Sequence, residues 1–187
     1  KQYVSDPKVF ADAFNYLIYD GEQVIRPEQL TDLDATQFAI PYREDEDGKP
    51  ESVQKYRDVL KTLAIKTDEH CTYLVLGIEN QSNVHYAMPV RNMLYDAMQY
   101  EKQVRQFAAA HRKKHDAPTS DEYLSGMNRD DRITPVITLV INFGSKRWDG
   151  PLSLCEMMPE TPAQVKAFVQ DYKVFLIDPM AMTDDDL

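Results

Sequence analysis

The sequence has few residues of the kinds that mark the commonest catalytic and metal sites. Its 187 residues include two cysteines, six glycines and four histidines. Cys71 and Cys155 lack the paired spacing of a zinc site, and the scattered histidines show no metal-ligand spacing. No glycine-rich phosphate loop and no His-X-Glu pair is present. These absences argue against a zinc site and a nucleotide-binding P-loop, and His85 is interpreted as an ordinary loop residue.

Long apolar runs are also missing. No run approaches the ~20 residues of a membrane span, and no secretory signal is recognisable at the start. We therefore expect a soluble, cytoplasmic protein without membrane contact. The 187 residues fit one domain, 1–187. Because the chain begins at Lys1 and ends in Thr-Asp-Asp-Asp-Leu, we expect it to be a piece of a longer protein.

Positive charge is scarce relative to negative charge. Lysine and arginine total 21 residues against 31 aspartates and glutamates, a formal net charge of −10. This excess of negative charge argues against binding of nucleic acid through overall electrostatic attraction, because proteins contact phosphates with Lys and Arg. Part of the negative charge is concentrated in residues 43–47 and 184–186, so local basic strips, such as residues 111–115, remain compatible with it.

What the chain does contain is a pair of apolar runs around a polar turn. Residues 59–65 and 73–78 are rich in strand-forming residues, and residues 66–71 between them are polar. If the turn centres on Asp68 and Glu69, antiparallel pairing places Asp58 opposite Glu79. Gln81 follows Glu79 by two residues and therefore points to the same face. The hairpin predicts a cluster of two carboxylates and an amide.

Two opposed acids need a neutralising partner. Directly opposed side chains have Cβ atoms about 4.5–5.5 Å apart, and like charges at that separation are destabilising. A divalent cation such as Mg²⁺ neutralises them naturally, because hard cations bind carboxylate oxygens and keep several waters. Asp58 and Glu79 are therefore predicted metal ligands for Mg²⁺ or Mn²⁺.

Several segments, in this order and spacing, resemble a known family. They are FADAFNY at 10–16, RDVL at 57–60, GIENQ at 77–81, MPVRNMLY at 88–95 and PVITLVINFG at 135–144, followed by Trp148. Together they resemble the recombination-promoting nuclease/putative transposase family of the PD-(D/E)XK nuclease superfamily. Gln81 stands where most of the superfamily has lysine, as is usual in this branch. Asn142 stands where the family more often has tyrosine.

The resemblance implies an α/β fold with a restriction-endonuclease-like core, a mixed central sheet flanked by helices. It implies a metal-dependent DNA endonuclease associated with recombination or a mobile element. Asp58 and Glu79 would hold Mg²⁺ with the Asn80 carbonyl as a further ligand, and Gln81 would hydrogen-bond a water or a phosphate oxygen. Arg91 would hold a phosphate or orient Glu79.

Two further positions follow from the same resemblance. Tyr95, one helical turn after Arg91, is the second residue expected to contact the substrate phosphate. An acid on the first helix often assists the metal site of such folds, so Asp12, or a residue upstream of this chain, is the candidate for that role.

The spacing of apolar residues and the helix start and stop signals predict the remaining elements. They are a helix over 7–19, a strand over 36–41, an acidic loop over 42–52, a helix from 89 to about 111, a polar connection over 117–132, a buried strand over 135–143, short helices over 152–158 and 162–171, and a strand over 174–177.

The helix from 89 to about 111 carries two stripes. Its apolar stripe is expected to pack on the sheet and consists of Val90, Met93, Leu94, Ala97, Val104, Phe107 and Ala108. A second stripe holds Arg91, Tyr95, Gln99 and Lys102, of which Gln99 and Lys102 are expected to be solvated.

Two other functions stay open at this point. The acidic charge and the missing lysine are compatible with a catalytically inactive DNA- or partner-binding module of a transposase-like protein. A plain structural domain would leave Asp58 and Glu79 exposed and far apart. The oligomeric state is open, a dimer being one option.

Overall fold

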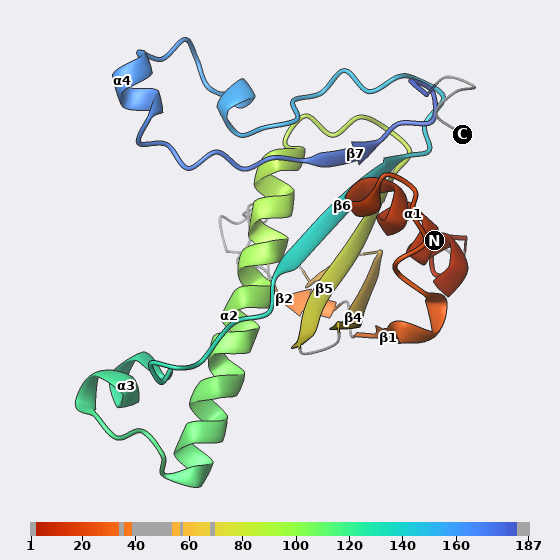
Figure 1. The fold of residues 1–187 in the computed structure, drawn as a ribbon. Helices are drawn as coiled ribbons and strands as arrows, with labels where there is room; N and C mark the ends of the chain where they lie inside the picture. The colour runs from red at the N-terminus through yellow and green to blue at the C-terminus, as the bar shows by residue number, and fades with distance from the viewer. Residues whose placement is uncertain (1–2, 34–35, 39–53, 57, 68–69, 183–187) are drawn as a thin grey trace.

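A five-stranded mixed sheet forms the centre of the protein (Figure 1). The computed structural model describes residues 3–33, 36–38, 54–56, 58–67 and 70–182. The strand order is β1-β4-β5-β6-β7, with the first two pairings antiparallel and the last two parallel. The strands are β1 (Leu30–Asp32), β4 (Val59–Thr67), β5 (His70–Gln81), β6 (Val136–Asn142) and β7 (Phe175–Ile177). This mixed sheet with helices on both faces confirms the predicted fold class and is compatible with a restriction-endonuclease-like fold.

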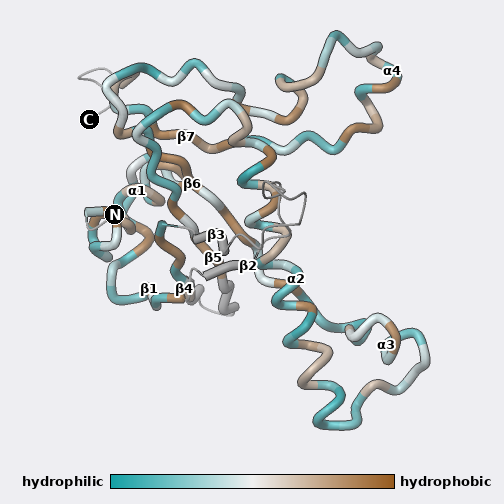
Figure 2. Tube along the Cα trace, turned by 180° about the vertical axis from the view of Figure 1, so that it is seen from behind, coloured by the Kyte–Doolittle hydropathy of each residue, from teal (hydrophilic) through white to brown (hydrophobic). Residues whose placement is uncertain are grey.

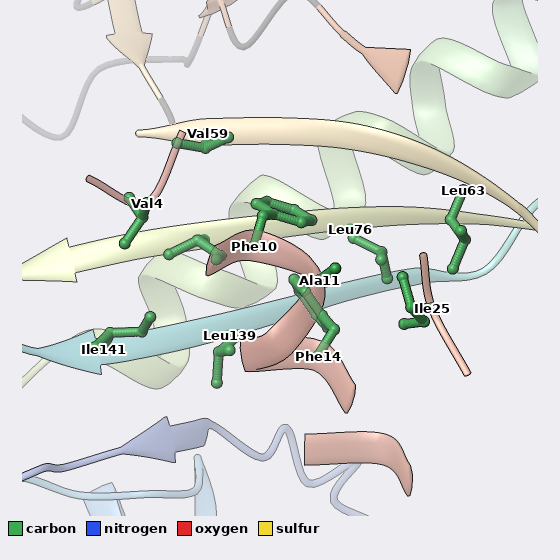
Figure 3. Close-up of a cluster of buried hydrophobic side chains, with 11 residues drawn as sticks. Val4, Phe10, Ala11, Phe14, Ile25, Val59, Leu63, Leu76, Leu139 and Ile141 are labelled. Atoms are coloured by element: carbon green, nitrogen blue, oxygen red, sulfur yellow. The ribbon is translucent and has the colours of Figure 1, made fainter. Parts of the chain in front are cut away.

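The helix α1 (Pro7–Tyr19) covers one face of the sheet and confirms the predicted helix over 7–19. It begins where the Asp6 side chain accepts a hydrogen bond from the Lys8 N–H, with Pro7 in the first turn. It ends at Asp20, which has a left-handed conformation. Figure 3 shows its buried face packed against side chains of the central strands. This apolar cluster includes Phe10, Ala11 and Phe14 of α1 and Leu63, Leu76, Ile78, Leu139 and Ile141 of the sheet.

The helix α2 (Met88–Lys114) covers the opposite face, but not with the predicted stripe. Met93 and Ala97 of the expected apolar stripe are exposed. The buried residues are Met88, Pro89, Asn92, Tyr95, Asp96 and Gln99. Gln99 is thus buried, contrary to the prediction, whereas Lys102 is exposed as expected.

The reason lies in the strands that α2 meets. Successive strand residues point to opposite faces, so the face under α2 presents Glu79, Gln81, Thr138 and Asn142, whose buried polar groups need partners. Small apolar clusters around Leu60 and Val140 flank this polar region. Asp96 and Arg91 of α2 supply hydrogen bonds to Thr138 and Glu79 that an aliphatic stripe could not give.

The remaining elements follow the predictions in part. β6 is buried on nearly its whole length, as the apolar run predicts, and β7 lies beside it. Of the predicted strand over 36–41, residues 39–41 lie outside the described residues, and the first three form β2 (Thr36–Phe38), paired with β3 (Gln54–Tyr56) in a separate two-stranded sheet. The 42–52 loop and the turn residues Asp68 and Glu69 lie outside the described residues.

Short helices differ most from the predictions. The segment over 152–158 forms only a 3₁₀ turn, η2 (Cys155–Met157), and the one over 162–171 contains α4 (Ala163–Lys166); another 3₁₀ turn, η1 (Pro27–Gln29), precedes β1. α3 (Ser120–Ser125) was not predicted. It begins with a capping box in which Thr119 and Glu122 bond each other's backbone N–H. Among the described residues, no helix has the length and apolar character needed to cross a membrane.

The C-terminal half of α2 extends past the sheet and carries α3 (Figures 1 and 2). Figure 2 shows this part of α2 as mainly hydrophilic, in contrast to the central strands. Gly126, which ends α3 with a φ of +74°, lies so close to α2 that a Cβ there would be 2.7 Å from the Ala108 Cβ. Only glycine fits both requirements at this position.

Candidate active site

The pairing of β4 with β5 sets the geometry of the candidate site. Val59 pairs with Ile78 and Leu60 with Gly77, which is the register that the predicted turn requires. Asp58 immediately precedes β4, and Glu79 follows Ile78 on β5. Asp58 therefore lies next to Glu79 at one end of the sheet, on the face that α2 covers.

Asp58 makes a specific contact with the backbone of β5. Its Oδ2 accepts a hydrogen bond of 2.9 Å from the N–H of Asn80. In an antiparallel ladder the N–H and C=O of one residue point toward the same neighbouring strand, so the carbonyl of Asn80 also faces the side on which Asp58 lies. The arrangement brings together a carboxylate and a backbone carbonyl, two of the three predicted metal ligands.

Glu79 is fully buried and bonded to Arg91 of α2. Its Oε2 accepts a hydrogen bond from Nη2 of Arg91 at 3.2 Å. The sequence predicts that a metal cation neutralises the negative charge of Glu79, whereas in the structure Arg91 neutralises it. The burial of Glu79 contradicts the exposure of both acids that the structural-domain alternative predicts.

Arg91 keeps its positive charge in this environment. Burial by itself lowers the pKa of Arg91, but the charge of Glu79 raises it, and Tyr95 and Asp58 add to that effect, so that the pKa of Arg91 is raised overall. The contribution of Asp58 indicates that both carboxylates act on the same guanidinium. Of its two predicted roles, Arg91 has the contact required to orient Glu79.

Tyr95 is buried one turn further along α2 and fixes Arg91. Its hydroxyl oxygen accepts a hydrogen bond of 3.2 Å from Nε of Arg91, and its ring centre lies 5.5 Å from the guanidinium carbon. The cation stacked on the ring adds to the hydrogen bond. Tyr95 therefore lies beside the candidate site and supports the arginine that holds Glu79.

Gln81 lies at the end of β5, on the same face as Glu79, and is nearly buried. It pairs with Asn142 of β6, and its carbonyl accepts the N–H of Phe143 at 2.8 Å. The structure thus groups Asp58, Glu79, Gln81 and Arg91 at one end of the sheet.

Asp12 is not part of this group. It is exposed on α1, and α1 packs on the face of the sheet opposite to Glu79. The structure therefore does not bring the predicted first-helix acid to the candidate site.

A second buried polar group under α2 was missed by the sequence analysis. Thr138 donates from Oγ1 to Oδ1 of Asp96 at 2.5 Å, and Tyr172 donates from its hydroxyl to Oδ2 of the same residue. These partners come from three distant parts of the chain. The spacing of Asn92, Asp96 and Gln99 by four and three residues is the signal that could have revealed a polar helix face.

The donor set fits a hard divalent cation. Across the described residues there is no cluster of three or more His, Cys, Asp and Glu side chains suited to holding a metal ion. A metal at this end of the sheet would depend on Asp58, Glu79, the Asn80 carbonyl and water. All of these are oxygen donors, the kind that Mg²⁺ takes while retaining several waters.

Comparison with known proteins gives one family. The family described as "Putative transposase, YhgA-like" matches residues 51–187, which include every residue of the candidate site. Searches of curated proteins and of solved structures gave no match.

Proposed function

Because the chain belongs to the YhgA-like transposase family, which is part of the PD-(D/E)XK-like nuclease group, we propose that it is a metal-dependent DNA endonuclease acting in recombination or transposition. The observation that carries the proposal is the register of β4 and β5, which supports Asp58 and Glu79 lying on one face of neighbouring strands, together with the hydrogen bond from the Asn80 N–H to Asp58. DNA is the proposed substrate and the cytoplasm the proposed location.

In this proposal Asp58, Glu79 and the Asn80 carbonyl hold Mg²⁺ or Mn²⁺. A bound divalent ion would supply a water of lowered pKa and stabilise charge on the scissile phosphate. Glu79 is kept in place for this by Arg91, and Arg91 by Tyr95. Gln81 would hydrogen-bond a water or a phosphate oxygen, but its amide is neutral and cannot act as a base.

Calorimetric titration with Mg²⁺ and Mn²⁺ tests the metal site directly. We expect binding heat in the parent and none in Asp58→Asn, which keeps an oxygen to accept the Asn80 N–H but removes the charge. Asp12→Asn is the matched control, because it removes the same charge from an exposed position on the opposite face. Cleavage of plasmid DNA in Mg²⁺ should follow the same pattern.

One observation favours a catalytically inactive DNA-binding module instead. Arg91 already bonds Oε2 of Glu79, so part of the carboxylate is occupied without a metal. That function predicts no metal heat at millimolar Mg²⁺ and DNA binding that is the same in Asp58→Asn and the parent. Equal metal heat in Asp58→Asn and Asp12→Asn would remove the nuclease proposal.

A further inference from the structure

The loop over residues 143–150 begins directly beside Gln81. In the parallel ladder Gln81 pairs with Asn142, the last residue of β6, and the N–H of Phe143 donates to the Gln81 carbonyl at 2.8 Å. Figure 1 shows the ends of β5 and β6 and the start of α2 at the same end of the sheet. The 143–150 loop therefore leaves the sheet where the candidate active site lies.

Glycine allows this loop to pass very close to the end of β5. A Cβ at Gly144 would lie 2.7 Å from the carbonyl oxygen of Ser82, a separation that Cβ atoms do not tolerate. The N–H of Gly144 is bonded to the Asn142 side chain at 3.0 Å. The first turn of the loop is thus held against the strand that carries Glu79.

Buried polar groups fix the backbone on both sides of Arg147. Nδ2 of Asn142 donates to the Lys146 carbonyl at 2.8 Å and to Oδ1 of Asp178 at 3.1 Å. Oδ2 of Asp178 accepts the N–H of Trp148 at 2.7 Å. Asn142 and Asp178 are both buried, so water competes little for these bonds.

The loop is also bonded to the segment that leads into α2. The Tyr86 hydroxyl donates to Oδ1 of Asp149 at 3.1 Å. Gly150 accepts a hydrogen bond from Nε1 of Trp148 at 3.0 Å, which closes the end of the loop. The loop is therefore anchored to β5, to β6, to the region after β7 and to the segment before α2, the helix that carries Arg91.

Two cationic side chains on this loop have no ion-pair partner among the described residues. Lys146 and Arg147 are exposed, and within the part of the chain that the structure describes neither has a carboxylate at ion-pair distance. Elsewhere in the described chain, adjacent exposed cations without an ion pair also occur at Lys113 and Lys114, but those lie at the far end of α2, whereas Lys146 and Arg147 lie on the loop beside Gln81. Phosphate oxygens are the natural partners of such a preorganised pair.

We propose that Lys146 and Arg147 bind phosphates of the DNA backbone beside Glu79, a role that rests on the proposed nuclease function. The fixed loop gives these residues a defined position relative to the scissile bond. Because the contacts go to the backbone, they would position DNA of any sequence and carry no sequence preference.

The test is fluorescence anisotropy with a short random-sequence duplex in chelator, across a range of salt concentrations. The variant Lys146→Ala/Arg147→Ala is compared with Lys113→Ala/Lys114→Ala, which removes the same charge from the far end of α2. We expect the loop variant to bind at least tenfold more weakly, with a salt slope reduced by about 0.9 per lost phosphate contact. The Lys113/Lys114 variant should bind like the parent.

Three results would overturn the inference: equal losses in both double variants, which would reflect net charge alone; a loss confined to the Lys113/Lys114 variant; or no duplex binding by the parent. Inorganic phosphate is added in a separate arm. Displacement of the duplex at low millimolar phosphate would mean that the loop binds free phosphate instead. Because no metal is present in this assay, a failure of the phosphate contacts can be told apart from a failure of the metal site, which calorimetry measures separately.

Discussion

The positive charge of the candidate site comes from a helix rather than from the strand. Position 81, where most of the superfamily has lysine, is a neutral glutamine, and Arg91 of α2 supplies the cation next to Glu79. An arginine cannot give up its proton at neutral pH, so it orients a carboxylate without acting as a base. The local chemistry therefore depends on how α2 is placed on the sheet.

Removing this cation should destabilise the protein. Arg91→Met leaves Glu79 buried without its ion-pair partner; since Arg91 is partly exposed, we expect a loss of about 2 kcal/mol, below the 3–5 kcal/mol of fully buried pairs. Urea denaturation at neutral pH measures it. The control is Arg105→Met on the same helix, whose exposed pair with Glu101 should contribute less than about 0.5 kcal/mol. Equal losses in the two variants would show that the Glu79 pair is not special.

A second change separates the two roles of Asp58. Asp58→Ala removes the acceptor of the Asn80 N–H and should cost about 1 kcal/mol in chelator, whereas Asp58→Asn should cost less because an amide oxygen still accepts that bond. Thermal melts in chelator compare the two variants. A larger loss in Asp58→Asn than in Asp58→Ala would contradict the hydrogen-bonding role.

Among the helices and strands, those that local sequence determines were predicted well. Asp6 and Pro7 define the start of α1, and the apolar runs on either side of residues 68–69 define β4, β5 and their register. Adjacent strands bring Asp58 and Glu79 together through that register alone, which is why the carboxylate pair could be predicted from sequence.

Features that depend on distant partners could not be predicted. The spacing of Asn92, Asp96 and Gln99 indicates a polar face of α2, but the helix sequence alone does not show that Thr138 and Glu79 lie under it and make that face the buried one. The same applies to Asn142, whose role depends on Asp178 after the last strand. α3 was missed because it has only six residues, although its capping box of Thr119 and Glu122 is a local signal that could have indicated it.

His111, near the end of α2, bonds two carboxylates in the segments before and after α3, and these bonds depend on pH. Its Nδ1 lies 2.6 Å from Asp116 and its Nε2 2.8 Å from Asp131. Hydrogen bonds to Asp116 and Asp131 raise the pKa of His111 against the effect of desolvation. A raised pKa means that the stabilisation is complete below the ordinary histidine pKa of about 6.5 and is lost as pH rises through the pKa of the folded state.

We therefore expect amides of residues 116–131 to be more protected from hydrogen exchange at pH 6 than at pH 9. Burial raises the pKa of Asp131, but hydrogen bonds from Asn128 and His111 outweigh it, so that the pKa is lowered overall and this carboxylate stays charged across that range. His111→Gln should abolish the pH dependence, and His115→Gln should retain it. A persistent dependence in His111→Gln would assign it to another group.

For the molecule as a whole, the negative net charge limits the affinity for DNA. With a net charge of −10, the overall field repels phosphate, and only local cations such as Lys146 and Arg147 oppose that repulsion. Ordinary nonspecific DNA binding has dissociation constants of about 10⁻⁶–10⁻⁴ M at physiological salt. We expect the dissociation constant of this protein for random duplex to lie in that range or above it. Anisotropy titration measures it, and nanomolar affinity would show that the charge distribution has been misjudged.

The contrast between the two faces of the sheet has a thermal consequence. Exposing the cluster around Phe14 and Leu139 would hydrate aliphatic and aromatic surface, which raises the heat capacity. Lifting α2 would hydrate the small apolar clusters around Leu60 and Val140 together with the polar side chains of Asn92, Asp96 and Gln99, and the polar part offsets some of the increase. The α1 side therefore has the larger heat-capacity increment for the area that it buries. Because cooling weakens apolar contacts, the packing of α2 on the sheet should change less between warm and cold than the packing of α1 on the opposite face.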